Sequence, residues 1–174
     1  MTNTEATLRQ ALKSQYHAAL AMLRDAIDRC PDAEWTSREH LNAFWQIAYH
    51  TLFFGHLYLE QNESAFVPWA GHQSQSQNPD GLPRPPDPER SLPLTPEPYS
   101  RQEVLAYWSV CDGMVDAALD RMDLDASDCG FHWYQMSKLE HQLVNLRHIQ
   151  HHTAQLMDRL RSTANIGIPW VGAR

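Results

Sequence analysis

The most informative segment of the chain is Asn145-Leu-Arg-His-Ile-Gln-His-His-Thr-Ala-Gln-Leu156. Successive residues of a helix are about 100° apart, so His148 and His152 lie one turn apart on the same side. They fall at the edge of the apolar stripe of this segment, whereas His151 points to solvent. Two imidazoles at this spacing can bind one ion, as in helical zinc motifs. Such a pair also arises by chance in a chain with ten histidines, so the spacing leaves both interpretations open.

A divalent ion needs a further ligand from another helix, and His50 is the best candidate. Its neighbours on the same face, Ile47, Phe54 and Leu57, are apolar, so an unpaired imidazole there would lose its hydration without compensation. A metal would remove that cost, and so would a hydrogen bond in an ordinary core. His56 lies about 120° further round the helix and is a weaker candidate.

Hydrophobic periodicity predicts four helices and no strand, which makes the chain all-α. The first is expected from about residue 4 to 29, and the second from about 38 to 61 after a capping-box spacing of Thr36 and Glu39. The third begins at Ser100, where Ser100 and Glu103 have the spacing of a capping box, and runs to about 122. The fourth begins at Ser137 and runs to about 162, and Asn165-Ile-Gly167 is expected to end it. We therefore expect a single domain over residues 1–174, folded as a four-helix bundle with the second helix most buried.

A long loop is expected between the second and third helices, over residues 64–99. This segment holds nine of the eleven prolines, and no helix survives that proline density. Loops of this length in small domains are often either functional lids or disordered. Trp69 and His72 are candidates for covering the metal site, although Trp69 is expected mainly to anchor the loop on the bundle.

Composition excludes several classes of protein. The net charge is -7 and the pI is about 5.7, so nucleic acid and anionic membranes are not expected partners. The three cysteines are not spaced for a disulfide framework or a thiolate zinc site, which favours a reducing cytoplasm. We see neither a signal peptide nor a run of about 20 apolar residues that could span a bilayer.

The fourth-helix stretch resembles the last helix of the DinB-like (YfiT-like) superfamily, which carries His-x3-His followed by Gln-Leu or Gln-Ile. Ile47-Ala-Tyr-His50 resembles the second-helix segment of that superfamily. The resemblance implies an up-down-down-up four-helix bundle, frequent homodimers, and a divalent metal held here by His50, His148 and His152. This chain departs from the common pattern in having Thr153-Ala154 where many members have Arg-Gly.

The resemblance also implies a range of activities. Characterised relatives include transferases that use mycothiol, bacillithiol or glutathione, some isomerases, and proteins classed as metal-dependent hydrolases. The first hypothesis is therefore a metal-dependent enzyme acting on a small molecule. The alternatives are a non-enzymatic metal-binding or stress-related bundle and a helical interaction module without metal.

Three neutral imidazoles leave a coordination position open, as catalytic zinc sites do. Zinc is the expected metal, and nickel and iron(II) also suit imidazole. No general base stands out, because Glu140 belongs to a helix start. His141 lies on the ligand edge, where it could contact substrate, but is more simply explained as a surface residue. Asn145 could orient a ligand or be an ordinary boundary residue.

Overall fold

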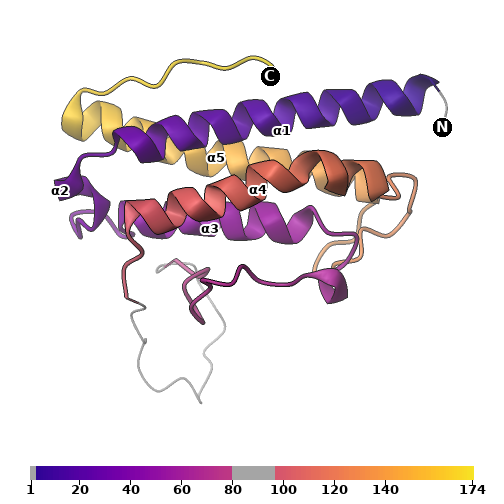
Figure 1. Cartoon of the computed structure of the whole chain (residues 1–174), viewed down its shortest axis with the longest axis horizontal. Helices are drawn as coiled ribbons and strands as arrows, with labels where there is room; N and C mark the ends of the chain where they lie inside the picture. The colour runs from indigo at the N-terminus through magenta and orange to yellow at the C-terminus, as the bar shows by residue number, and fades with distance from the viewer. Residues whose placement is uncertain (1–2, 80–96) are drawn as a thin grey trace.

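The computed structural model describes residues 3–79 and 97–174, and all regular structure in these ranges is helical. Four main helices pack as a bundle (Figure 1), so the all-α prediction is confirmed. The elements are α1 (Asn3–Arg29), α2 (Asp32–Trp35), α3 (Phe44–Tyr58), the 3-10 turn η1 (Glu63–Ala65), α4 (Arg101–Arg121) and α5 (Lys138–Ala164).

The four main helices form a closed arrangement in which each packs against two others. α1 contacts α4 and α5, and α3 also contacts α4 and α5. In Figure 1, α1 and α5 finish at the end of the bundle where α3 and α4 begin. α3 and α5, the helices expected to carry the three histidines, are therefore direct neighbours.

Most helix ends follow the predicted local signals. α1 ends at Arg29, two residues before Pro31. At the start of α4, Ser100 Oγ accepts from Glu103 N at 3.2 Å and Glu103 Oε2 accepts from Ser100 N at 2.8 Å, a complete capping box. Ser137 caps α5, which stops at Asn165 in the left-handed conformation (φ 54°). These ends are fixed by short-range hydrogen bonds.

The predicted start of the second helix at residue 38 is wrong, because α3 begins at Phe44. The Thr36 and Glu39 capping box does not form. Instead, Ala43 N donates to Gln46 Oε1 at 2.8 Å, and Arg159 of α5 donates to the carbonyl of Asn42 at 2.8 Å. Contacts with distant residues therefore override the local signal.

The same helix also ends early, at Tyr58 rather than residue 61. The buried ammonium of Lys138 donates to the carbonyls of Glu60 at 2.5 Å, Gln61 at 3.0 Å and Cys129 at 3.2 Å. A lysine from α5 thus binds the carbonyls just beyond α3 together with the loop that precedes α5.

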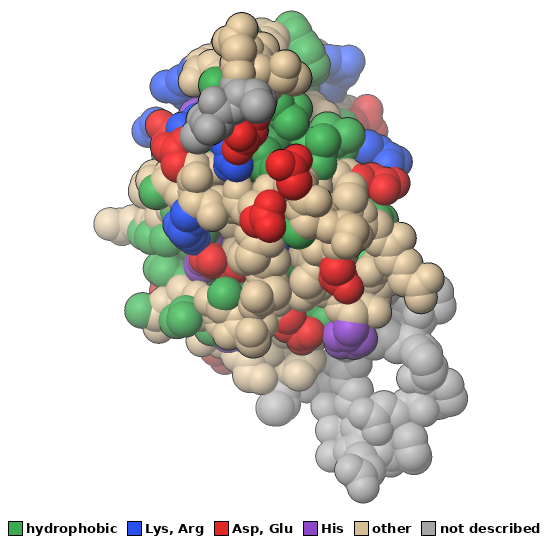
Figure 2. All heavy atoms as spheres, turned by 90° about the vertical axis from the view of Figure 1, so that its right-hand side faces the viewer, with side chains coloured by type: hydrophobic (Ala, Val, Ile, Leu, Met, Phe, Trp, Pro, Cys, Tyr) green, Lys and Arg blue, Asp and Glu red, His purple; other side chains and the backbone are tan. Residues whose placement is uncertain are grey.

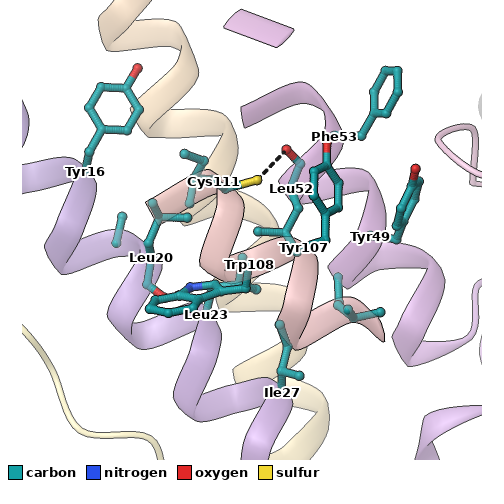
Figure 3. Packing of buried hydrophobic residues seen from close by; sticks show 14 of the residues in the cluster. Tyr16, Leu20, Leu23, Ile27, Tyr49, Leu52, Phe53, Tyr107, Trp108 and Cys111 are labelled. Atoms are coloured by element: carbon teal, nitrogen blue, oxygen red, sulfur yellow. Dashed lines mark hydrogen bonds between the residues drawn. The ribbon is translucent and has the colours of Figure 1, made fainter. Parts of the chain in front are cut away.

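The core is built from the facing sides of the four main helices, and Figure 3 shows the part of it between α1, α3 and α4. Trp108 fills the space beside α1 and donates from Nε1 to the carbonyl of Leu20 at 2.8 Å. Cys111 Sγ donates to the carbonyl of Leu52 at 3.6 Å. Every residue of α3 except Phe54 is buried, which confirms the prediction that this helix is the most enclosed.

All three cysteines are buried and none is in a disulfide. Burial raises the pKa of the Cys30 thiol to about 12 and also raises the pKa of Cys111. Their environments are those of small core residues rather than of nucleophiles.

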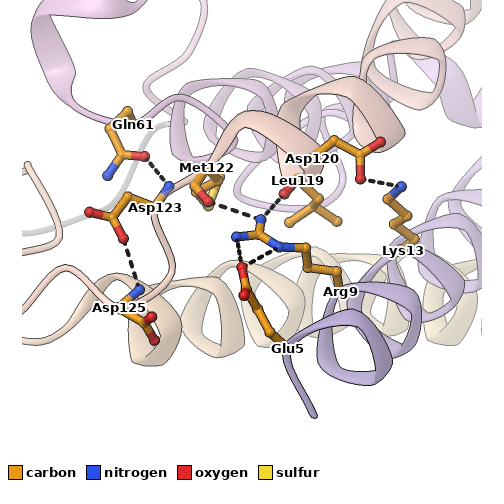
Figure 4. A network of polar contacts seen from close by, with 9 residues as sticks. All are labelled: Glu5, Arg9, Lys13, Gln61, Leu119, Asp120, Met122, Asp123 and Asp125. Carbon is orange, nitrogen blue, oxygen red and sulfur yellow. Dashed lines mark hydrogen bonds and ion pairs between the residues drawn. The ribbon is translucent and has the colours of Figure 1, made fainter. Parts of the chain in front are cut away.

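Arg9 of α1 joins the N-terminal part of α1 to the end of α4 (Figure 4). Its guanidinium is largely buried and donates to the carbonyl of Leu119 and, at 2.9 Å, to that of Met122. Glu5 accepts from the same group at 2.8 Å. One turn further on, Lys13 pairs with Asp120 at 2.7 Å.

The surface at the α1 N-terminal end of the bundle is mixed in charge. Figure 2 shows Asp and Glu side chains spread over this face among uncharged ones, with Lys and Arg interspersed. None of the helices in the two described ranges has a run apolar enough to cross a lipid bilayer.

The described part of the predicted 64–99 loop is anchored on aromatic residues. Trp69 stacks on Tyr107 with ring centroids 4.9 Å apart and planes 11° apart, which confirms its anchoring role. The hydroxyl of Tyr99 accepts from Gln73 N at 2.6 Å and donates to the carbonyl of Gly71 at 2.9 Å. Residues 80–96 of the predicted loop lie outside the described residues.

Candidate metal centre

The structure brings together the three histidines that the sequence predicts as ligands. His50 comes from α3, and His148 and His152 come from α5. One ring nitrogen from each lies within 4.8 Å of the others, and no second such group of His, Cys, Asp or Glu occurs among the described residues. The convergence of the three side chains is thus observed, and their binding of a metal stays a prediction.

Asn145 fixes the position of the two ligand helices relative to each other. It is fully buried, and its Nδ2 donates to the carbonyl of Gly55 at 3.1 Å. This bond joins the two helices close to the histidines. Asn145 lies about one turn before His148 on α5, and Gly55 lies little more than one turn after His50 on α3. Asn145 is therefore not a boundary residue, and it makes no hydrogen bond to a ligand histidine. Its hydrogen bond joins the two helices beside the centre.

Hydrogen bonds direct two of the imidazoles inward. Nδ1 of His50 donates to the main-chain carbonyl of Gln77 at 2.7 Å, and Nδ1 of His152 donates to Gln155 Oε1 at 2.8 Å. Because a neutral imidazole carries one proton, Nε2 of each ring keeps its lone pair. Nε2 of His50 lies 3.1 Å from Nε2 of His148. No pattern in the sequence indicates Gln77, whereas Gln155 lies three residues after His152, on a neighbouring position of the same helix.

The three imidazoles are neutral at physiological pH. Burial lowers the pKa of His50 to about 4. Burial and then the neighbouring imidazoles lower the pKa of His148 to about 2, and burial also lowers that of His152. A metal ion therefore has no protons to displace from His50 and His148 near pH 7.

These residues fit a divalent ion. Nε2 of His50 and Nε2 of His148 are about 3 Å apart, so their lone pairs repel each other unless a proton or a cation lies between them. Nδ1 of His148 is buried without a hydrogen-bond partner among the described residues. A donor set of three imidazoles suits zinc, nickel or iron(II). The group contains no carboxylate, so the ligands add no negative charge.

The other histidines of the two helices take different roles. His56 is buried on another face of α3, with Nδ1 3.1 Å from the hydroxyl of Tyr107. His151 is exposed. Both are outside the three-histidine group, as predicted. His72 of the loop binds the hydroxyl of Tyr49 at 2.7 Å instead of reaching the centre.

The expectation that His141 is a surface residue is wrong. It is fully buried under the segment before α5, where Phe131 stacks on it with ring centroids 4.8 Å apart. Neither ring nitrogen has a hydrogen-bond partner among the described residues. Tyr58 contacts His141 at 4.6 Å between ring centroids and His148 at 6.4 Å, so its ring stands between His141 and the centre.

An open hollow of about 540 Å³ lies along the outer side of α5, next to one of the three histidines. The hollow is lined by Val144, Arg147, His148, Gln150, His151 and Ala154. His148 therefore belongs both to the hollow and to the three-histidine group.

The fold and the site together define a four-helix bundle with a candidate three-histidine metal centre between α3 and α5. The sequence pattern of the DinB superfamily matches residues 15–156, a range that includes all three histidines. The chain belongs to the DinB superfamily. No curated protein and no solved structure matches it.

Proposed function

We propose that this protein is a metal-dependent enzyme that acts on a small molecule, as a thiol-dependent S-transferase or a hydrolase. The observation that carries the proposal is the group of three neutral imidazoles, from two helices, with His148 also lining an open hollow. Zinc is the proposed metal, and nickel or iron(II) would suit the same nitrogens.

Each residue has a defined task in this proposal. His50, His148 and His152 would hold the ion, which when bound lowers the pKa of a thiol or water and polarises a substrate oxygen. Phe54 lies 4.8 Å from the ring of His50 and 5.8 Å from that of His148. It is the one partly exposed residue of α3, so it offers an apolar wall for the organic part of a substrate.

Metal analysis of the full-length protein tests the first half of the proposal. The protein is purified without chelator and without a nickel affinity column, and metal is measured by mass spectrometry. We expect about one ion per chain in the wild type and in His151→Ala, which changes an exposed neighbour on the same helix. His148→Ala is expected to lose the ion. A metal-free wild type, or equal metal in both variants, contradicts the proposal.

Turnover assays test the second half. The metal-loaded protein is incubated with electrophiles and each of mycothiol, bacillithiol and glutathione, and separately with ester and amide substrates. Conjugation that disappears in His148→Ala supports a transferase, and hydrolysis that disappears supports a hydrolase. Metal binding without either reaction favours the alternative, a non-enzymatic metal-binding or stress-related protein.

The remaining superfamily properties belong to the same proposal. The helix directions in Figure 1 support an up-down-down-up course. A homodimer in the cytoplasm is proposed from the superfamily resemblance and from the cysteine content. Light scattering of the full chain tests the dimer, and a monomeric mass would refute it.

A further inference from the structure

The main-chain carbonyl of Gln77 connects the proline-rich loop to the three-histidine group. We infer that Gln77 is a positioning residue for His50, so that metal affinity and the conformation of the loop segment 69–78 depend on each other. This inference rests on the proposed function, because it concerns the same metal centre. It adds a residue of the loop to a centre whose three histidines all lie on helices.

The contact determines which nitrogen of His50 is available. A carbonyl can only accept, so Nδ1 of His50 carries the proton in the 2.7 Å bond to Gln77. Nε2 then bears the lone pair and faces Nε2 of His148 at 3.1 Å. Without the carbonyl, the other tautomer and other ring orientations become accessible, and both weaken ligation.

The loop is built to present this carbonyl. Ser76 N donates to the carbonyl of Gln73 at 3.1 Å, and Asn78 N donates to that of Gln75 at 3.1 Å, which makes two consecutive turns. Ser76 is buried, and Gln73 N is held by the hydroxyl of Tyr99 at 2.6 Å. Gln77 thus lies in an ordered turn anchored on the bundle.

Gln75 provides a way to perturb the turn without touching the centre. It is exposed and has φ 71°, at the third position of the turn formed by residues 73–76. Turns with positive φ at this position favour glycine, and a β-branched residue is strained there. Gln75→Gly and Gln75→Val both remove the bond from Asn78 Nδ2 to Gln75 Oε1, so they differ mainly in the backbone conformation they favour.

The coupling acts in both directions. If the ordered turn strengthens metal binding by some factor, bound metal must stabilise the ordered turn by the same factor. Backbone amides of residues 71–78 should therefore exchange hydrogen more slowly when metal is present. A loop that merely lies near the site would show neither effect.

The test compares the zinc affinities of the wild type, Gln75→Gly and Gln75→Val by competition with a chromophoric chelator. We expect Gln75→Gly to bind like the wild type and Gln75→Val to bind about tenfold more weakly, the scale of lost support for a metal ligand. Hydrogen exchange of peptides covering residues 71–78 should slow on adding zinc in the wild type and change less in Gln75→Val.

Two results separate the inference from the proposed function. Equal zinc affinity of Gln75→Val and Gln75→Gly overturns the inference and leaves the metal site intact, as does exchange in residues 71–78 that does not respond to zinc. A wild type that binds no zinc, nickel or iron overturns the proposed function itself. Thermal unfolding of the metal-free variants checks that both are folded.

Discussion

Replacing Arg9 by methionine should separate the stability of the bundle from the properties of the metal centre. Methionine keeps much of the aliphatic length but removes the bonds to the carbonyls of Leu119 and Met122. Hydrogen bonds from a charged group contribute roughly 1.5–3 kcal/mol each. With the lower value for each of the two bonds, the free energy of unfolding should fall by about 3 kcal/mol. For a chain of this length that lowers Tm by roughly 6–12 °C.

Lys13→Met is the matched control, one turn away on the same helix. Lys13 pairs with Asp120, whose side chain is 58% exposed, and such pairs contribute about 1 kcal/mol or less. Urea unfolding followed by circular dichroism measures both variants without metal, and zinc affinity is measured separately. Equal losses of stability in the two variants would refute the reasoning. Weaker zinc binding by Arg9→Met would show that α1 and α4 are not independent of the centre.

Three further outcomes follow from the site and the loops. The pKa values of His50 and His148 are about 4 and about 2, so both imidazoles stay neutral as the pH falls from 7.5 to 5.5. Zinc affinity should therefore fall no more than about tenfold over this range, whereas three unperturbed imidazoles would lower it about a thousandfold. Chelator competition at each pH measures the zinc affinity. Burial, and then the charge of Lys138, lower the pKa of His141 to about 4 in the folded protein. An exposed histidine has a pKa of about 6.5, so below that pH the unfolded chain binds more protons at His141 than the folded chain does. The metal-free protein should therefore lose stability in urea as the pH falls from about 6.5 towards 4, and His141→Phe should reduce that loss. Gly130→Ala should cost at least about 1 kcal/mol in the same assay, because Gly130 has φ 83° and an added Cβ would lie 2.6 Å from the carbonyl oxygen of Gln61.

The sequence predicts those parts of the fold that depend on nearby residues. The capping box of Ser100 and the stop at Asn165 each involve atoms within a few residues, and both are found as expected. The pairing of His148 with His152 follows from helix geometry alone. The choice of His50 as their partner needed its apolar surroundings and the resemblance to the superfamily.

The errors occur where distant segments decide the outcome. The start of α3 depends on Arg159, which is far away in sequence and binds the carbonyl of Asn42. His141 lies at the angle round α5 that the sequence indicates, but its burial under Phe131 depends on how the preceding loop folds back. The contact of Gln77 with His50 has no periodic or compositional signal. Each of these positions is set by tertiary packing that a local pattern does not contain.

The burial of the three cysteines would protect an enzyme that handles alkylating agents from modifying itself. Reaction with an electrophile requires the thiolate, and the raised pKa values of Cys30 and Cys111 keep those thiols protonated. Cys129 is also buried. Quinones or maleimides would thus find none of the three thiols exposed on the folded chain. A reporter dye could accordingly be attached at an introduced surface cysteine with the native three left in place.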